Sequence, residues 1–70
     1  MAMRTLAEFT TRNNEEHIVT EQEGRITLTY TIHGEGRADA LQLAFQGGNR
    51  VEVKMLDGGW YIITVHLKQA

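Results

Sequence analysis

The chain has 70 residues, of which 41% are hydrophobic and 23% charged, so it has the composition of one small folded domain spanning residues 1–70. Its seven lysines and arginines against nine aspartates and glutamates lack the basic excess that is typical of nucleic-acid binders. The lack of cysteine excludes disulfides and thiolate zinc sites and fits a cytoplasmic protein, and the short apolar runs predict neither a signal peptide nor a membrane helix.

The N-terminal segment carries a helix-start signature. Thr5 and Glu8 have the spacing of a capping box, in which the hydroxyl and the carboxylate each accept a hydrogen bond from a free backbone N–H of the first turn. Leu6 and Phe9 have a spacing that places them on one face of a helix. Because polar residues follow at 10–14, we predict a short helix here.

Two strands joined by a turn are predicted next. Residues 26–32 alternate apolar and polar side chains in strict period two, and β-branched and aromatic residues dominate. Glu23-Gly24 stands before this run, and glycine supplies the positive φ of a hairpin turn. Residues 17–22 are therefore the expected partner strand. One face of the second strand is apolar and the other is a row of threonines; the apolar residues are Ile26, Leu28, Tyr30 and Ile32.

The middle of the chain admits two interpretations. Residues 41–46 alternate like a strand, yet residues 38–46 are rich in alanine and contain no β-branched residue. Ala38, Leu41 and Phe45 share one helix face, and Gly47-Gly48 follows where a left-handed helix end is expected. We predict a helix at 38–46. The alternative is a five-stranded antiparallel meander that closes into a small barrel and has an N-terminal helix.

A second hairpin is predicted from residues 50–56 and 60–68, which both alternate in period two. Asp57-Gly58-Gly59 forms the loop between them. A three-residue loop places Leu56 opposite Trp60 and Lys54 opposite Ile62.

Both halves of the chain thus share one outline of helix, strand, turn and strand. The sequence predicts an α+β fold of the order αββαββ, in which one four-stranded antiparallel sheet has helices on one face.

Little in the sequence indicates catalysis. Cysteine and serine are both absent, and the three histidines, His17, His33 and His66, have no spacing that is typical of metal ligands. Four glutamates between residues 15 and 23 form an acidic stretch that we expect to be solvated. We therefore predict no enzyme, no metal and no cofactor.

An apolar group on the polar side of the second hairpin is the most informative feature. Leu56, Trp60 and Ile62 are expected on the face opposite the core, with Lys54 and His66 continuing that face. Large apolar side chains grouped on a surface are typical of an interface, and tryptophan is a frequent anchor there. The competing interpretation is that the N-terminal segment folds over this group and completes a second small core.

Two functions follow from these patterns. The first is a non-catalytic protein-binding module that acts as an inhibitor or adaptor by occupying a partner's surface, with a second copy of the chain as one candidate partner. The second is a nucleic-acid-binding protein in which Trp60 stacks on bases while Arg25, Lys54 and Lys68 contact phosphates. The net charge argues against the second function, and no membrane partner is expected.

Overall fold

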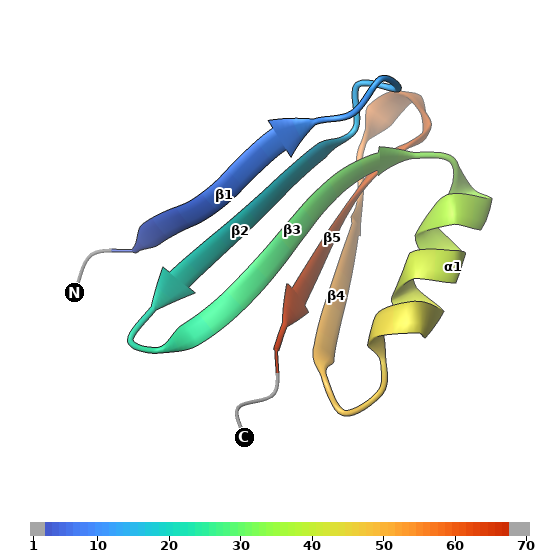
Figure 1. Cartoon of the computed structure of the whole chain (residues 1–70). Helices are drawn as coiled ribbons and strands as arrows, with labels where there is room; N and C mark the ends of the chain where they lie inside the picture. Colours follow the sequence, from blue (N-terminus) through green and yellow to red (C-terminus); the bar gives the residue numbers. More distant parts are fainter. Residues whose placement is uncertain (1–2, 68–70) are drawn as a thin grey trace.

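Five strands and one α-helix make up the part of the chain that the structure describes, residues 3–67 of this computed structural model (Figure 1). The strands are β1 (Arg4–Thr10), β2 (Glu16–Gln22), β3 (Arg25–His33), β4 (Arg50–Met55) and β5 (Trp60–His66). The helix is α1 (Glu35–Phe45), and a single 3-10 turn at Asp57–Gly59 joins β4 to β5.

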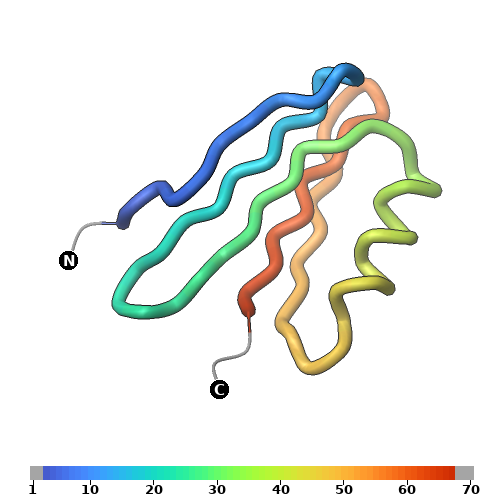
Figure 2. The backbone as a smooth tube through the Cα atoms, viewed as in Figure 1, coloured from blue at the N-terminus to red at the C-terminus, as the bar shows by residue number. Residues whose placement is uncertain are grey.

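All neighbouring strands are antiparallel, in the order β1-β2-β3-β5-β4. Figure 2 shows the consequence in space, since the red β5 runs beside the green β3 although a helix and a strand separate them in the chain. Strands β1 and β4 are therefore the two edges of the sheet.

The predicted hairpins and the predicted helix are confirmed. Strands β2 and β3 are joined by Glu23 and Gly24, whose positive φ angles of 55° and 79° are those of a tight hairpin turn. The predicted register of the second hairpin also holds, because Lys54 lies opposite Ile62. Helix α1 begins at Glu35, one turn earlier than the alanine-rich segment indicates.

The N-terminal helix and the order αββαββ are wrong. Residues 4–10 form β1, which pairs with β2, so the two halves of the chain do not share one outline. The five-stranded antiparallel sheet of the alternative prediction is confirmed, but its fifth strand is β1 and residues 41–45 are helical. The physical reason is a bulge, because the register shifts between Thr5 and Ala7 and leaves Leu6 as the extra residue. This insertion breaks period two and gives Leu6 and Phe9 the spacing of a helix face.

The core lies between α1 and three strands. Ile32 of β3 and Ile63 and Val65 of β5 are fully buried, and Ala38 of α1 is 3% exposed. Leu41 and Phe45 of α1 pack against this cluster as well. Burying each aliphatic side chain stabilises the fold by about 1.5–3 kcal/mol. Helix α1 contacts β5, β4 and β3, so it covers the part of the sheet that these three strands form (Figure 1).

The sheet therefore has two different sides. We call the side with α1 the helix side and the opposite one the open face. Directly opposed residues of antiparallel strands share a face, so the registers assign every strand residue to one side or the other. Among the described residues, the segments other than α1 are strands of the sheet or turns at its ends, and none packs over the open face.

Candidate functional site

The open face consists of rows of side chains that cross the sheet from β2 to β4. Three rows follow directly from the paired residues of β2, β3, β5 and β4. They are Thr20–Thr27–His66–Arg50, Ile18–Thr29–Thr64–Glu52 and Glu16–Thr31–Ile62–Lys54. Threonines occupy the middle of the face, with apolar residues at one end and basic residues at the other.

The apolar end brings together the three residues that the sequence singles out. Trp60 and Ile62 are alternate residues of β5 and so share the open face, and the N–H of Leu56 donates to the carbonyl of Trp60 at 2.7 Å. The indole of Trp60 meets the ring of His33 edge-on, with centroids 5.0 Å apart. That imidazole is held in turn by a hydrogen bond from its Nε2 to the carbonyl oxygen of Gly58 at 3.0 Å.

The three apolar residues are half-buried. The competing prediction that the N-terminal segment covers them is wrong, because that segment extends the sheet beside β2. We call Leu56, Trp60 and Ile62 the apolar cluster.

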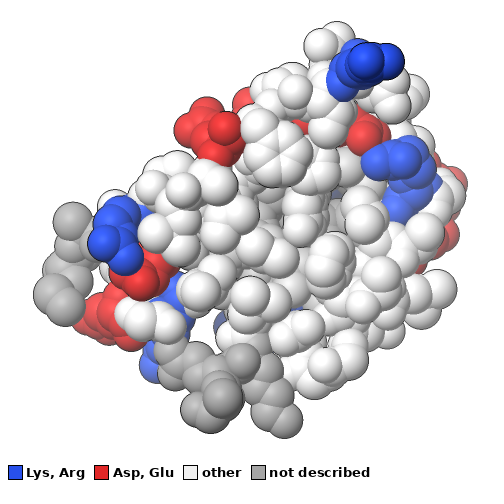
Figure 3. All heavy atoms as spheres, in the orientation of Figure 1, with Lys and Arg blue, Asp and Glu red and all other residues white. Residues whose placement is uncertain are grey.

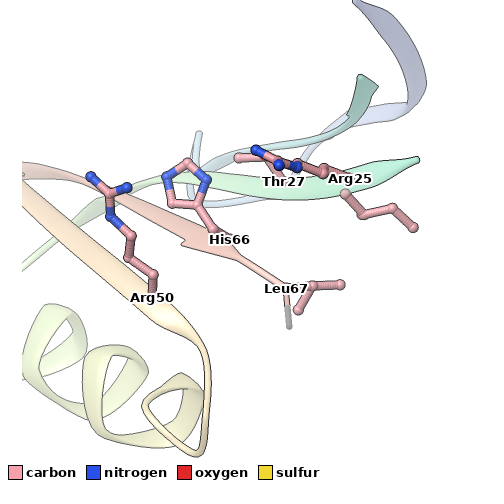
Figure 4. A pocket seen from close by; sticks show the side chains of 6 residues that line it. Arg25, Thr27, Arg50, His66 and Leu67 are labelled. Carbon is pink, nitrogen blue, oxygen red and sulfur yellow. The ribbon is translucent and has the colours of Figure 1, made fainter. Parts of the chain in front are cut away.

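The basic end of the open face is an open depression (Figure 4). Arg25 and Thr27 come from β3, His66 from β5 and Arg50 from β4, and their side chains surround the depression together with Leu67. Lys68, the other cation predicted to contact phosphates, lies outside the described residues.

Glu52 neutralises part of this end. The Arg50 guanidinium donates to its Oε1 at 2.8 Å and Nε2 of His66 lies 3.3 Å from its Oε2. The hydrogen bonds from His66 and Arg50 hold the pKa of Glu52 below its ordinary value. Glu52 does not line the depression, but it binds Arg50 and His66, which do, and so lowers the attraction of this end for an anion.

An aromatic stack that the sequence did not predict crosses the helix side. The rings of Phe9 and His17 stack at 4.8 Å, His17 meets Tyr30 edge-on at 4.6 Å, and Tyr30 stacks on Phe45 at 5.5 Å. Burial raises the pKa of the Tyr30 hydroxyl. Nε2 of His17 is buried and has no hydrogen-bond partner among the described residues. Figure 3, viewed from this side, shows a broad uncharged surface with charges along its rim.

An ion pair between the buried Glu15 and the partly exposed Arg37 ties the β1–β2 hairpin to the helix. Glu15 is only 3% exposed, and its carboxylate accepts a hydrogen bond from Arg37 of α1 at 2.7 Å and one from the N–H of His33 at 3.5 Å. The acidic stretch is therefore not wholly solvated as expected. Glu16, the next residue, points to the open face opposite Thr31.

The three histidines lie apart. His17 belongs to the aromatic stack, His33 packs on Trp60, and His66 pairs with Glu52. Across residues 3–67, no three His, Asp or Glu side chains come together as a metal-binding group. None of the helices within that range has the length and apolar composition needed to cross a membrane.

Comparison with known protein families, with curated proteins and with solved structures finds no match for this chain. The function is therefore argued from the two sides and two edges of the sheet alone.

Two features of the site lay beyond sequence reasoning. The stack from Phe9 to Phe45 joins residues of four separate elements, and the Glu15–Arg37 pair joins a loop to a helix. The sequence signals only the turn, since Asn13 and Asn14 precede Glu15 and asparagine tolerates the left-handed conformation that Asn14 adopts at φ 61°.

Proposed function

We propose that this chain is a small, non-catalytic protein-binding module that uses the apolar end of its open face. It acts as an inhibitor or adaptor by occupying the surface of its partner, and its lack of cysteine fits the cytoplasm. The observation that carries the proposal is that Leu56, Trp60 and Ile62 adjoin on a sheet face that no described segment covers. Lys54 and His66 continue this face and supply polar contacts at the rim.

The chemistry of this face favours recognition over reaction. Threonine hydroxyls and half-buried apolar side chains make a flat surface, whereas a reactive site needs a concave pocket that excludes water. A rigid tryptophan flanked by aliphatic residues is a typical centre of a protein interface. The edge-on contact with His33 orders the indole before a partner arrives, which lowers the entropy cost of binding.

The test is affinity capture with immobilised wild-type chain and with Trp60→Ala, Ile62→Ala and Leu43→Ala variants. Leu43 is the matched control because it lies on α1 and is 71% exposed. We expect a partner that wild type and Leu43→Ala retain and that both open-face variants lose, while all the variants stay folded by circular dichroism. A partner that Trp60→Ala still retains in full would contradict the proposal.

A second function, nucleic-acid binding, has one observation in its favour. Arg25, Arg50, Lys54 and Trp60 all lie on the open face. Glu16 shares a row with Lys54, and Glu52 binds Arg50, so few phosphate contacts would release counterions. Retention of the same wild-type preparation on heparin at low salt would favour this function over protein binding.

A further inference from the structure

The backbone of β4 presents free hydrogen-bonding groups at the edge of the sheet. Leu56 and Trp60 form a hydrogen-bonded pair, because the N–H of Leu56 donates to the carbonyl of Trp60 at 2.7 Å. Hydrogen-bonded pairs alternate along an antiparallel ladder, so Lys54, Glu52 and Arg50 also bond to β5. The N–H and C=O groups of residues 51, 53 and 55 therefore point away from the sheet.

The backbone of β4 is free to pair at this edge, and its charged residues, Arg50, Glu52 and Lys54, all lie on the open face. The strand has no proline, and its pairing with β5 is regular from Arg50 to Met55. Val53 and Met55 are 40% and 73% exposed on the helix side of this edge. Proteins usually shield edge strands with proline, bulges or charges, so a regular edge that lacks the first two pairs only with a strand whose charges complement its own.

The charges of β4 rule out most ways in which it can pair with itself. An antiparallel pair of identical strands has a two-fold axis at one residue, which faces its own copy. An axis at Glu52 sets two carboxylates against each other and Arg50 against Lys54, and an axis at Lys54 sets two ammonium groups together. An axis at Val51 places Val53 opposite the loop at 47–49, where Gly48 has φ 83° and the strand has ended.

An axis at Val53 avoids these like-charge contacts and keeps the facing residues within β4 and the adjoining Leu56. Glu52 of each copy then faces Lys54 of the other on the open face, which forms two opposite-charge pairs. On the helix side Val53 faces Val53, and Val51 of each copy faces Met55 of the other. The outward-pointing backbone groups of residues 51, 53 and 55 are the ones that this register joins by hydrogen bonds.

We propose that β4 pairs antiparallel with β4 of a second copy of this chain, with the two-fold axis at Val53. The two sheets become one continuous sheet, and the two α1 helices lie on the same side of it. The contact covers the exposed Val53 and Met55 and leaves Trp60 outside the seam. Leu56 lies opposite Arg50 of the other copy at the end of the seam. The inference is still independent of the proposed function, because Trp60 and Ile62 belong to β5, one strand in from the seam, and remain open to a different partner.

The first test is sedimentation of the whole chain over a concentration series, with charge variants of β4. Wild type is expected to form a dimer, and Lys54→Glu or Glu52→Lys to weaken it by roughly tenfold or more, because each change creates two like-charge contacts. The double variant Glu52→Lys/Lys54→Glu restores opposite charges in this register and should restore the dimer. Met55→Lys should weaken it too, whereas the matched control Leu43→Lys, equally exposed on α1, should not.

The second test reads the register directly. The chain has no cysteine, so single cysteines report on one position each. At the axis the two Cα atoms lie about 5.5 Å apart, within the range that a disulfide spans. Val53→Cys should therefore cross-link quickly under mild oxidation, and Val51→Cys should not.

Three outcomes overturn the proposal. The first is a monomer at every concentration, and the second is a dimer that Lys54→Glu leaves intact. The third is equal cross-linking of the two cysteine variants. If Trp60→Ala dissociates the dimer while Lys54→Glu does not, the copies meet through their open faces instead.

Discussion

The two edge strands, β1 and β4, end the same sheet in different ways. Strand β1 contains the bulge at Leu6, and all seven of its residues are exposed. Strand β4 is regular and is backed by α1, with Val51 packed against the core. A bulge twists an edge and disrupts its ladder, so β1 is a poor template for further strands. The difference supports the proposal that β4, rather than β1, is the edge that pairs with a second copy.

The two edges also differ in how they are held. On the β4 side the strands share one buried core with the helix, whereas β1 is attached through β2 and lies beyond α1. The β1–β2 hairpin is instead joined to α1 by one specific interaction, the Glu15–Arg37 ion pair. Each side should therefore respond to a different kind of substitution.

The largest effect is expected from the same substitution made at two positions on the helix side, one near β4 and one near β1. Val65 and Val19 both lie opposite Leu28, on its two neighbouring strands, but Val65 is fully buried and Val19 half-buried. Val65→Ala should lower the free energy of unfolding by about 2–3 kcal/mol, because it removes buried methyl groups and leaves a cavity under α1. Val19→Ala should cost about 1 kcal/mol or less. Urea denaturation measures both, and equal losses would show that the β1 side shares the core.

A smaller effect on stability is expected from breaking the ion pair that joins the β1–β2 hairpin to α1. Arg37→Ala leaves the buried carboxylate of Glu15 without its charged partner, so it should cost about 1–2 kcal/mol. The matched control is Arg4→Ala, which removes the exposed pair with Glu21 at 3.0 Å and should change stability by less than about 0.5 kcal/mol. Amide hydrogen exchange should quicken in β1 and β2 for Arg37→Ala before it quickens in β5. Exchange that rises evenly over the sheet would contradict a local tie.

The smallest effect concerns acid and the charges of β4. Because the pKa of Glu52 is lowered in the folded chain, its contribution to stability is present at neutral pH. That contribution is lost as the pH falls from the ordinary range of a glutamate through the lowered value. Thermal melts of Glu52→Gln, at concentrations where the chain is monomeric, should therefore decline less steeply with acid than those of wild type. Parallel declines would mean that the contacts of Glu52 with Arg50 and His66 do not persist in solution.

The sequence predicted the parts of the fold that depend on neighbouring residues. Period-two alternation located β3, β4 and β5, and the glycine turns located both hairpins. The three-residue loop was enough to predict that Lys54 faces Ile62, and with it the side on which Trp60 lies. Each of these features is determined within a dozen or so residues of chain.

The rest depends on contacts that a local pattern does not contain. The bulge at Leu6 led to the incorrect prediction of a helix at β1. The extra residue interrupts the alternation of side chains between the two faces of the strand. The ion pair of Glu15 with Arg37 and the stack from Phe9 to Phe45 exist only once the whole sheet has assembled. For the same reason, alternation predicted which face carries the apolar cluster but could not predict that its three residues are half-buried.

The central position of β5 has a consequence for how the protein is made. This strand follows all the others in the chain, yet it lies between β3 and β4 and supplies Ile63 and Val65 to the core. A nascent chain that has emerged only as far as β4 can form the hairpin of β2 and β3 but has no interior against which α1 can pack. Closing the β3–β5 ladder is a long-range step, and its loop-closure entropy makes it the expected slow event of folding. Until β5 leaves the ribosome, β3 has one unpaired side and β4 has no partner strand, so both are exposed to chaperones and to other nascent chains.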